Sequence, residues 1–182
     1  MAVDNKNING LDDVIRKLQN AKDYLQNKVP TVVGVEAVKH FKNNFQLEGF
    51  LNRVLKKWEE RKIKRLGSTD NQKILSKSGE LADSIDFRIQ GNTIIIYSDK
   101  VYAQIHNEGG KITVTDKMRK YFWAMHYEAK QQSNTIAAEQ YKGMALAKII
   151  VMPKRKYMGD SVVLDEAIVN KITRDLDKIL AA

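Results

Sequence analysis

The spacing of apolar residues changes twice along this chain, and the change limits the folds that the chain can adopt. Apolar residues recur every three or four positions over residues 11–25, 35–45 and 164–180, as they do on one face of a helix. Between residues 85 and 115 the period is two, which is typical of strands. We therefore predict an α+β fold, in which an antiparallel β-meander packs against an N-terminal helical hairpin and a long C-terminal helix.

The length of 182 residues fits one domain, because a chain of this size can bury about 70% of its unfolded surface in a single core. We predict one domain over residues 1–182 with four parts. They are a helical hairpin at 1–45, a basic arm or loop at 46–76, a sheet with inserted helices at 77–160, and the C-terminal helix at 161–182.

Short polar residues and a proline mark the predicted ends of the helices. Pro30 separates the two N-terminal helices, and Thr31 is the predicted N-cap of the second. A cap of this kind accepts a hydrogen bond from the free N–H groups of the first helical turn. The predicted N-caps of later helices are Ser78, Thr115 or Asp116, and Ser161.

Three strands make up the predicted meander. "DFRIQ" alternates apolar and polar residues, and Gly91-Asn92 can supply the positive φ angles of a tight hairpin turn before "TIIIYS". "VYAQIH", residues 101–106, is the predicted third strand. Later in the chain, "KIIVMP" is a further strand that Pro153 ends.

The sequence contains no cysteine, which excludes disulfides, thiolate zinc sites and cysteine nucleophiles and suits folding in a reducing cytoplasm. No segment approaches the ~20 apolar residues that cross a membrane. The first ten residues, "MAVDNKNING", lack the apolar core of a signal peptide. We expect a protein that has no membrane partner and is made in the cytoplasm.

The formal charge of +9 arises from 31 Lys and Arg against 22 Asp and Glu. Such an excess favours contact with nucleic acid or with an acidic protein surface, although isolated lysines more often serve only to keep a surface solvated. Basic residues are dense in the predicted arm, where they alternate with Phe50 and Trp58. Direct DNA contact by this arm is therefore an alternative that the residues leave open.

The string "VYAQIHNEGG" places His106 two residues before Glu108, which raises the question of an acid–base or metal site. The chain has three histidines and no cysteine, and neither the H-E-x-x-H spacing nor the cysteine motif of a zinc deaminase is present. Phosphate loops, nucleophile elbows and dinucleotide fingerprints are also absent from the sequence. We predict no catalytic residue, cofactor or metal, with a hydrolase or metalloenzyme centred on this pair as the less favoured alternative. In the structural interpretation, His106 and Asn107 end an edge strand by hydrogen-bonding a turn, and Gly109-Gly110 permit backbone angles that are closed to other residues.

Six strings, read in order, resemble the phage virion morphogenesis family, whose members are also called tail-completion proteins and occur in Mu-like prophages. Together they span roughly residues 40–180. "VYAQIHNEGG" is the most specific of them, and "MPKRKYMG" departs from the family's usual I-P-x-R-x-F-x-G pattern. The others are "NFQLEGF", "KKWEERK", "ILSKSGELADSI" and "VTDKMRKYF".

The resemblance implies a non-catalytic virion component that acts late in assembly, in tail completion or head–tail joining. Its implied partners are other tail or head–tail connector proteins and further copies of the chain, often in a six-fold ring. Open strand edges and glycine turns agree with surfaces that neighbouring subunits cover. Positive charge would help such a protein to dock on acidic partner rings or to lie near packaged DNA.

The residues that we predict at interfaces belong to three strings. They are Phe50, Trp58, Arg61 and Lys62 in the arm, Tyr102, His106, Asn107 and Glu108 in "VYAQIHNEGG", and Arg155 and Tyr157 before the last helix. Ordinary packing or solvation is the alternative interpretation for each of them.

Overall fold

The computed structural model of the chain describes residues 5–61 and 73–182, with side chains from residue 10 onward in the first range. Its helices are α1 (Asn5–Asp23), the π-helical turn η1 (Tyr24–Lys28), α2 (Val29–Leu47), α3 (Glu80–Asp83), α4 (Ala103–Glu108), α5 (Asp116–Gln131), α6 (Thr135–Leu146) and α7 (Val162–Ala181). Its strands are β1 (Gly49–Leu51), β2 (Leu55–Lys57), β3 (Ile85–Gln90), β4 (Thr93–Ser98), β5 (Gly110–Thr113) and β6 (Ile149–Met152). This combination confirms the predicted α+β class.

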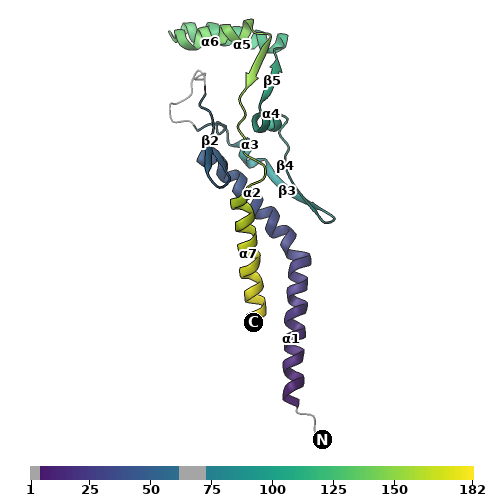
Figure 1. Cartoon of the computed structure of the whole chain (residues 1–182). Helices are drawn as coiled ribbons and strands as arrows, with labels where there is room; N and C mark the ends of the chain where they lie inside the picture. The colour runs from purple at the N-terminus through teal and green to yellow at the C-terminus, as the bar shows by residue number, and fades with distance from the viewer. Residues whose placement is uncertain (1–4, 62–72) are drawn as a thin grey trace.

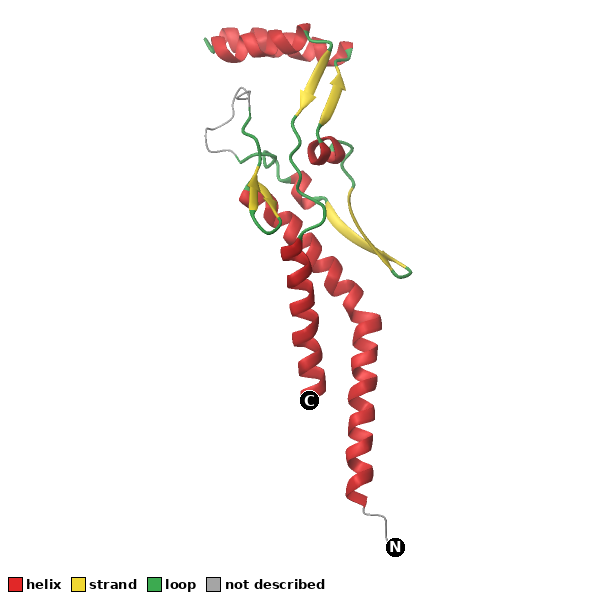
Figure 2. Cartoon of the chain, viewed as in Figure 1, coloured by secondary structure: helices red, strands yellow, loops and turns green. Residues whose placement is uncertain are grey.

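The N-terminal helical pair and the C-terminal helix are present as predicted. Helices α1 and α2 are joined through η1, and Figure 2 shows the chain bending where they meet. Pro30 lies in the first turn of α2, where its missing N–H breaks no helical hydrogen bond. Because α2 already begins at Val29, Thr31 lies inside the helix, and its prediction as an N-cap is wrong.

The strands form three separate antiparallel pairs, β1–β2, β3–β4 and β5–β6, rather than one continuous meander. The β3–β4 hairpin follows the prediction, with Gly91 at φ 58° in its turn. The predicted third strand at residues 101–106 is wrong, because most of this segment belongs to helix α4. A segment of six residues is too short for its apolar spacing to distinguish a strand, with a period of two, from a helix, with a period of 3.6. The next strand, β5, begins only at Gly110.

The predicted helix caps are partly confirmed. Thr115 accepts a hydrogen bond from Met118 N at 3.3 Å, and Ser161 accepts one from Leu164 N at 3.3 Å. The N-cap of α3 is Gly79 with φ 77°, so the prediction for Ser78 is wrong. The left-handed backbone at this position favours glycine over a side chain that would cap the helix.

The first half of the predicted basic arm is a compact β-hairpin, β1–β2, which packs beside α2. Its N–H groups reach back to the body of the chain, since Trp58 N donates to Glu48 O at 2.8 Å and Leu51 N donates to the side chain of Asn44 at 3.1 Å. The predicted basic arm is thus a hairpin over 49–57 that is hydrogen-bonded to the rest of the chain. The remainder of the predicted loop, residues 62–72, lies outside the described residues.

The main core lies where α2, the β1–β2 hairpin, the 153–161 loop and α7 meet. Phe45 is 1% exposed, and its ring lies 4.9 Å from the ring of Tyr157 and 5.5 Å, edge on, from that of Trp58. Aromatic pairs of this geometry contribute about 0.5–1.5 kcal/mol beyond the area they bury. Three rings from distant parts of the sequence thus hold the middle of the molecule together.

Helices α5 and α6 form a second packed unit at the end of the molecule opposite to the start of α1, and the β5–β6 pair links this unit to the middle (Figure 1). The cluster between them consists mostly of alanines, which allow a close approach of the two helices. His126 is buried there, with its ring Nδ1 2.7 Å from Ala138 O. Nowhere in the described part of the chain is a helix long and apolar enough to span a bilayer.

Two glycines give a matched test of the contact between α2 and β3. A Cβ on Gly34 would lie 2.2 Å from the Phe87 ring, whereas a Cβ on Gly143 in α6 would meet nothing within 4 Å. Overpacking of this kind costs about 1–3 kcal/mol. We expect Gly34→Ala to lower the thermal unfolding midpoint.

Gly143→Ala is the control, because replacing a glycine inside an exposed helix with alanine favours folding by about 1 kcal/mol. We expect this variant to raise the unfolding midpoint. Equal shifts for the two variants would contradict the close packing of α2 on β3.

Candidate functional site

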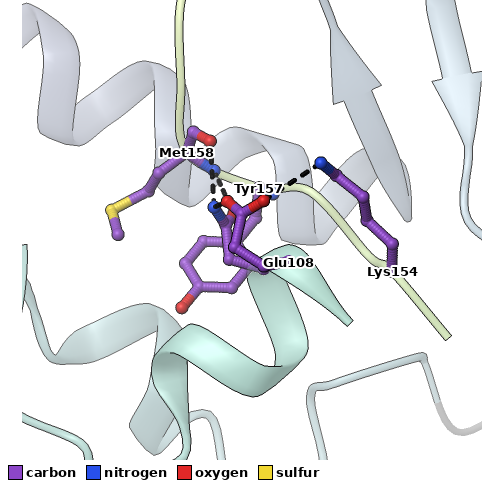
Figure 3. A network of polar contacts seen from close by, with 5 residues as sticks. Glu108, Lys154, Tyr157 and Met158 are labelled. Atoms are coloured by element: carbon purple, nitrogen blue, oxygen red, sulfur yellow. Dashed lines mark hydrogen bonds and ion pairs between the residues drawn. The ribbon is translucent and has the colours of Figure 1, made fainter. Parts of the chain in front are cut away.

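Two of the strings that carry the family resemblance, "VYAQIHNEGG" and "MPKRKYMG", meet in space at the side chain of Asn107. Its Oδ1 accepts hydrogen bonds from Tyr157 N at 2.8 Å and Met158 N at 3.0 Å, and its Nδ2 donates to Met158 O at 3.3 Å. The same Nδ2 donates to Glu108 Oε1 at 2.6 Å, and Glu108 pairs with Lys154 at 3.0 Å (Figure 3). The side chain of Asn107 thus forms the hydrogen bonds with the loop backbone that a paired strand would form in a sheet.

The backbone of α4 holds the same loop at two further points. Arg155 N donates to His106 O at 2.9 Å, and the Tyr157 hydroxyl donates to Ala103 O at 2.9 Å. Gly109 ends α4 with φ 72°, and a Cβ there would lie 2.8 Å from Lys154 N. This residue must therefore be glycine both for its backbone angle and for the close approach of the loop.

On its other side the loop is bound by α2 and by the β1–β2 hairpin. Asn44, which is 0% exposed, donates to Tyr157 O at 3.0 Å, and the indole of Trp58 donates to Lys156 O at 2.8 Å. The Arg155 guanidinium donates to Glu59 O at 3.1 Å. We use the term loop clamp for the side chains of Asn44, Trp58, Asn107 and Tyr157 together with the 153–161 loop.

Helix α7 begins directly after the loop clamp. The Ser161 hydroxyl donates to Leu51 O at 2.8 Å while it caps the first turn of α7, and Val162 N donates to the side chain of Asn52 at 2.8 Å. The direction in which α7 leaves the core is therefore set by the β1–β2 hairpin.

Burial and neighbouring charged or polar groups shift the pKa of three side chains in this region. Burial raises the pKa of Tyr157 to about 12, and burial also lowers the pKa of Arg155. Hydrogen bonds from Lys154 and then Asn107 lower the pKa of Glu108, so this carboxylate stays ionised at neutral pH. These shifts favour fixed contacts over proton transfer near pH 7.

The structure places the ten predicted interface residues in three kinds of surroundings. Four of them are buried within the chain itself, as in the alternative interpretation of ordinary packing: Phe50, Trp58, Arg155 and Tyr157. Tyr102, His106, Asn107, Glu108 and Arg61 keep some exposure or lie at the surface, and Lys62 lies outside the described residues.

Most of these residues come together around the 153–161 loop. The Arg61 guanidinium donates to Lys73 O at 2.7 Å, and its positive charge adds to burial in lowering the pKa of Arg155 in the loop. Tyr102, the N-cap of α4, and His106 on α4 form an edge-on ring pair at 5.9 Å. Sequence reasoning missed Asn44, although a polar residue amid the apolar positions of "HFKNNF" was a signal that could have found it.

The side chains of His106 and Glu108 do not converge on a common point. They stand two residues apart on α4, and side chains at that spacing point to different sides of a helix. Glu108 is already paired with Lys154. Within the described residues, no group of three or more His, Asp or Glu side chains is placed to hold a metal ion.

The buried phenol of Tyr157 gives a test at high pH. Its pKa is about 12 when folded and 10.0 without burial, so the stability it contributes is complete below pH 10 and is lost as the pH rises to about 12. Two pKa units correspond to about 2.7 kcal/mol of unfolding free energy. Denaturant unfolding between pH 9 and 12 measures this decline.

Tyr157→Phe is the matched variant. We expect it to lose about 1 kcal/mol near pH 7 with the hydrogen bond to Ala103 O, and to show a shallower decline in unfolding free energy above pH 10. A decline as steep as that of the wild type would contradict the enclosed position of this phenol.

Comparison with known proteins shows the family of this chain. The model of the phage virion morphogenesis family matches residues 8–177. No curated protein and no solved structure matches the chain. Because the match covers nearly the whole length, including both strings that meet in the loop clamp, the chain belongs to the phage virion morphogenesis family.

Proposed function

We propose that this chain is a structural part of the virion of a Mu-like phage, which acts in tail completion or head–tail joining. It is made in the cytoplasm of the bacterial host and functions in the assembled particle. It binds further copies of itself, for which a ring of six is the expected arrangement, and it binds other tail or connector proteins. The family supports a role in virion morphogenesis, and the surface of the chain supports a role in binding neighbours.

The observation that carries this proposal is the exposure of large apolar side chains at both ends of an elongated molecule (Figure 1). Extended apolar surface on a soluble chain marks contact with other proteins. At the α5–α6 end the exposed residues are Tyr121, Tyr127, Ile136, Leu146, Ile149 and Val151. At the α1–α7 end they are Leu11, Val14, Ile15, Leu18, Leu25, Val169 and Leu180.

The α5–α6 end also carries an excess of positive charge. Residues 110–152, which form the α5–α6 end, carry seven Lys and Arg against three Asp and Glu. A basic surface with exposed apolar side chains fits an acidic rim on another virion protein. This end is the better candidate for contact with a tail or connector protein.

Contact with packaged DNA is the second candidate function. Arg53 and Lys56 are exposed on the β1–β2 hairpin. DNA binding through such residues weakens steeply as salt increases, because each neutralised phosphate releases counterions. Failure to retain duplex DNA even at low salt would remove this candidate.

A phage that carries a stop codon in the gene for this chain tests the main proposal. We expect electron micrographs of the lysate to show DNA-filled heads and separate tails, because joining needs the missing part. Adding the purified wild-type chain to the lysate should produce joined particles and restore infectivity. Normal particles without the chain, or heads that never fill with DNA, would contradict a late structural role.

A further inference from the structure

The α1–α7 end carries an apolar stripe that the chain itself leaves uncovered. Leu11, Leu18 and Leu25 recur every seven residues along α1 and η1, with Val14 and Ile15 between them. Leu11 is 60% exposed and Leu18 is 59% exposed. At 1.5 Å per residue the stripe is about 21 Å long, which is enough for several layers of helix–helix packing.

The stripe does not face α7 of its own chain. Helix α7 instead meets a neighbouring side of α1–η1, where Tyr24 donates to Asp175 at 2.8 Å and both side chains are only partly exposed. Figure 2 shows α1 and α7 running to the same end of the molecule. The apolar stripe of α1 is therefore available to another helix.

Helix α7 has a second, smaller apolar stripe on its free side. Val169 is 60% exposed and Leu180 is 45% exposed, and they lie about 16 Å apart along the helix at 1.5 Å per residue. Leu164 and Ile168, by contrast, pack into the main core. The two stripes thus belong to different surfaces, and neither has a cover within the described chain.

The charges of the two helices are opposite and small. Helix α1 with η1 carries five Lys and Arg against three Asp and Glu, while α7 carries three Lys and Arg against four Asp and Glu. Together these elements account for only one of the nine excess positive charges of the chain. Two copies can therefore bring their helical ends together without strong repulsion, and α1 is attracted to a neighbouring α7 more than to a neighbouring α1.

We propose that the α1 stripe of one copy packs on the free side of α7 in the next copy. The contact joins two different surfaces, so it is heterologous, and its repetition around an axis closes a ring where the rotation between copies divides a full turn. The inference rests on the self-association in the proposed function and names the surfaces that make it. It leaves the basic α5–α6 end free for the other virion proteins.

Two variants that each damage one surface test this pairing. Leu18→Glu damages the α1 stripe and Val169→Glu damages the α7 surface, and both replace exposed side chains. We expect the wild type to be oligomeric by size-exclusion chromatography with light scattering. Each variant alone should run as a monomer of 20.8 kDa.

The mixture of the two variants distinguishes a heterologous contact from a symmetric one. Each variant keeps one intact surface, so a 1:1 mixture should form dimers and stop there. A contact between two α1 stripes would leave Leu18→Glu monomeric but allow Val169→Glu to associate on its own. A monomeric wild type at every concentration, oligomers of either single variant, or a mixture that stays monomeric would overturn the proposal.

Controls separate these outcomes from loss of the fold and from failure of the proposed function. Asn20→Glu makes a similar change about 200° around α1 from Leu18, and we expect it to keep the wild-type mass. Circular dichroism reports whether each variant keeps its helices. The masses are measured on the purified chain, whereas the proposed function is tested in phage lysates, so one can fail without the other.

The absence of cysteine in the sequence allows a second measurement with smaller substitutions. Copies with Leu18→Cys mixed with copies with Val169→Cys should cross-link into dimers with a short bismaleimide. Asn20→Cys in place of Leu18→Cys should reduce the yield at least tenfold. Equal yields from the two pairs would overturn the proposed contact even if the glutamate variants unfold.

Discussion

The structure depends on one requirement, which is that the backbone of the 153–161 loop must find hydrogen-bond partners inside the protein. The loop has no strand or helix of its own at residues 153–161, yet Tyr157 in its middle is fully enclosed. An enclosed peptide group without a partner costs about 1–3 kcal/mol. Asn44 on α2, Trp58 just after β2 and Asn107 on α4 supply those partners, and in doing so they fix these parts of the chain relative to one another.

This arrangement gives the most distinctive strings of the sequence a mechanical role. In "VYAQIHNEGG", Asn107 binds the loop through hydrogen bonds, and Gly109 leaves room for the loop to approach. Residues 155–161 of "MPKRKYMGDS" belong to the loop itself. Strand β6 comes directly before the loop in the chain, and helix α7 comes directly after it. The loop clamp therefore sets the positions of the two ends, and those ends carry the exposed apolar side chains that a neighbour would cover.

The sequence predicted the long helices well, because apolar periods repeated over many residues and polar caps such as Thr115 and Ser161 are local signals. It did not predict helix α4, since a segment of six residues satisfies both periods and tertiary contacts decide between them. The sequence predicts Phe50 and Trp58 at an interface because basic residues surround them. Their burial depends on the long-range pairing of the β1–β2 hairpin with α2 and the loop, which no local pattern contains.

Amide hydrogen exchange in the loop tests the central claim most directly, with Asn107→Ala compared to Gln104→Ala on the exposed side of the same helix. The account predicts that the N–H groups of Tyr157 and Met158 exchange as slowly as those of α2 in the wild type and in Gln104→Ala. In Asn107→Ala they lose their acceptor, and their exchange should accelerate by at least tenfold while that of α2 changes less. Fast exchange of these two groups in the wild type, or unchanged protection in Asn107→Ala, would contradict the loop clamp.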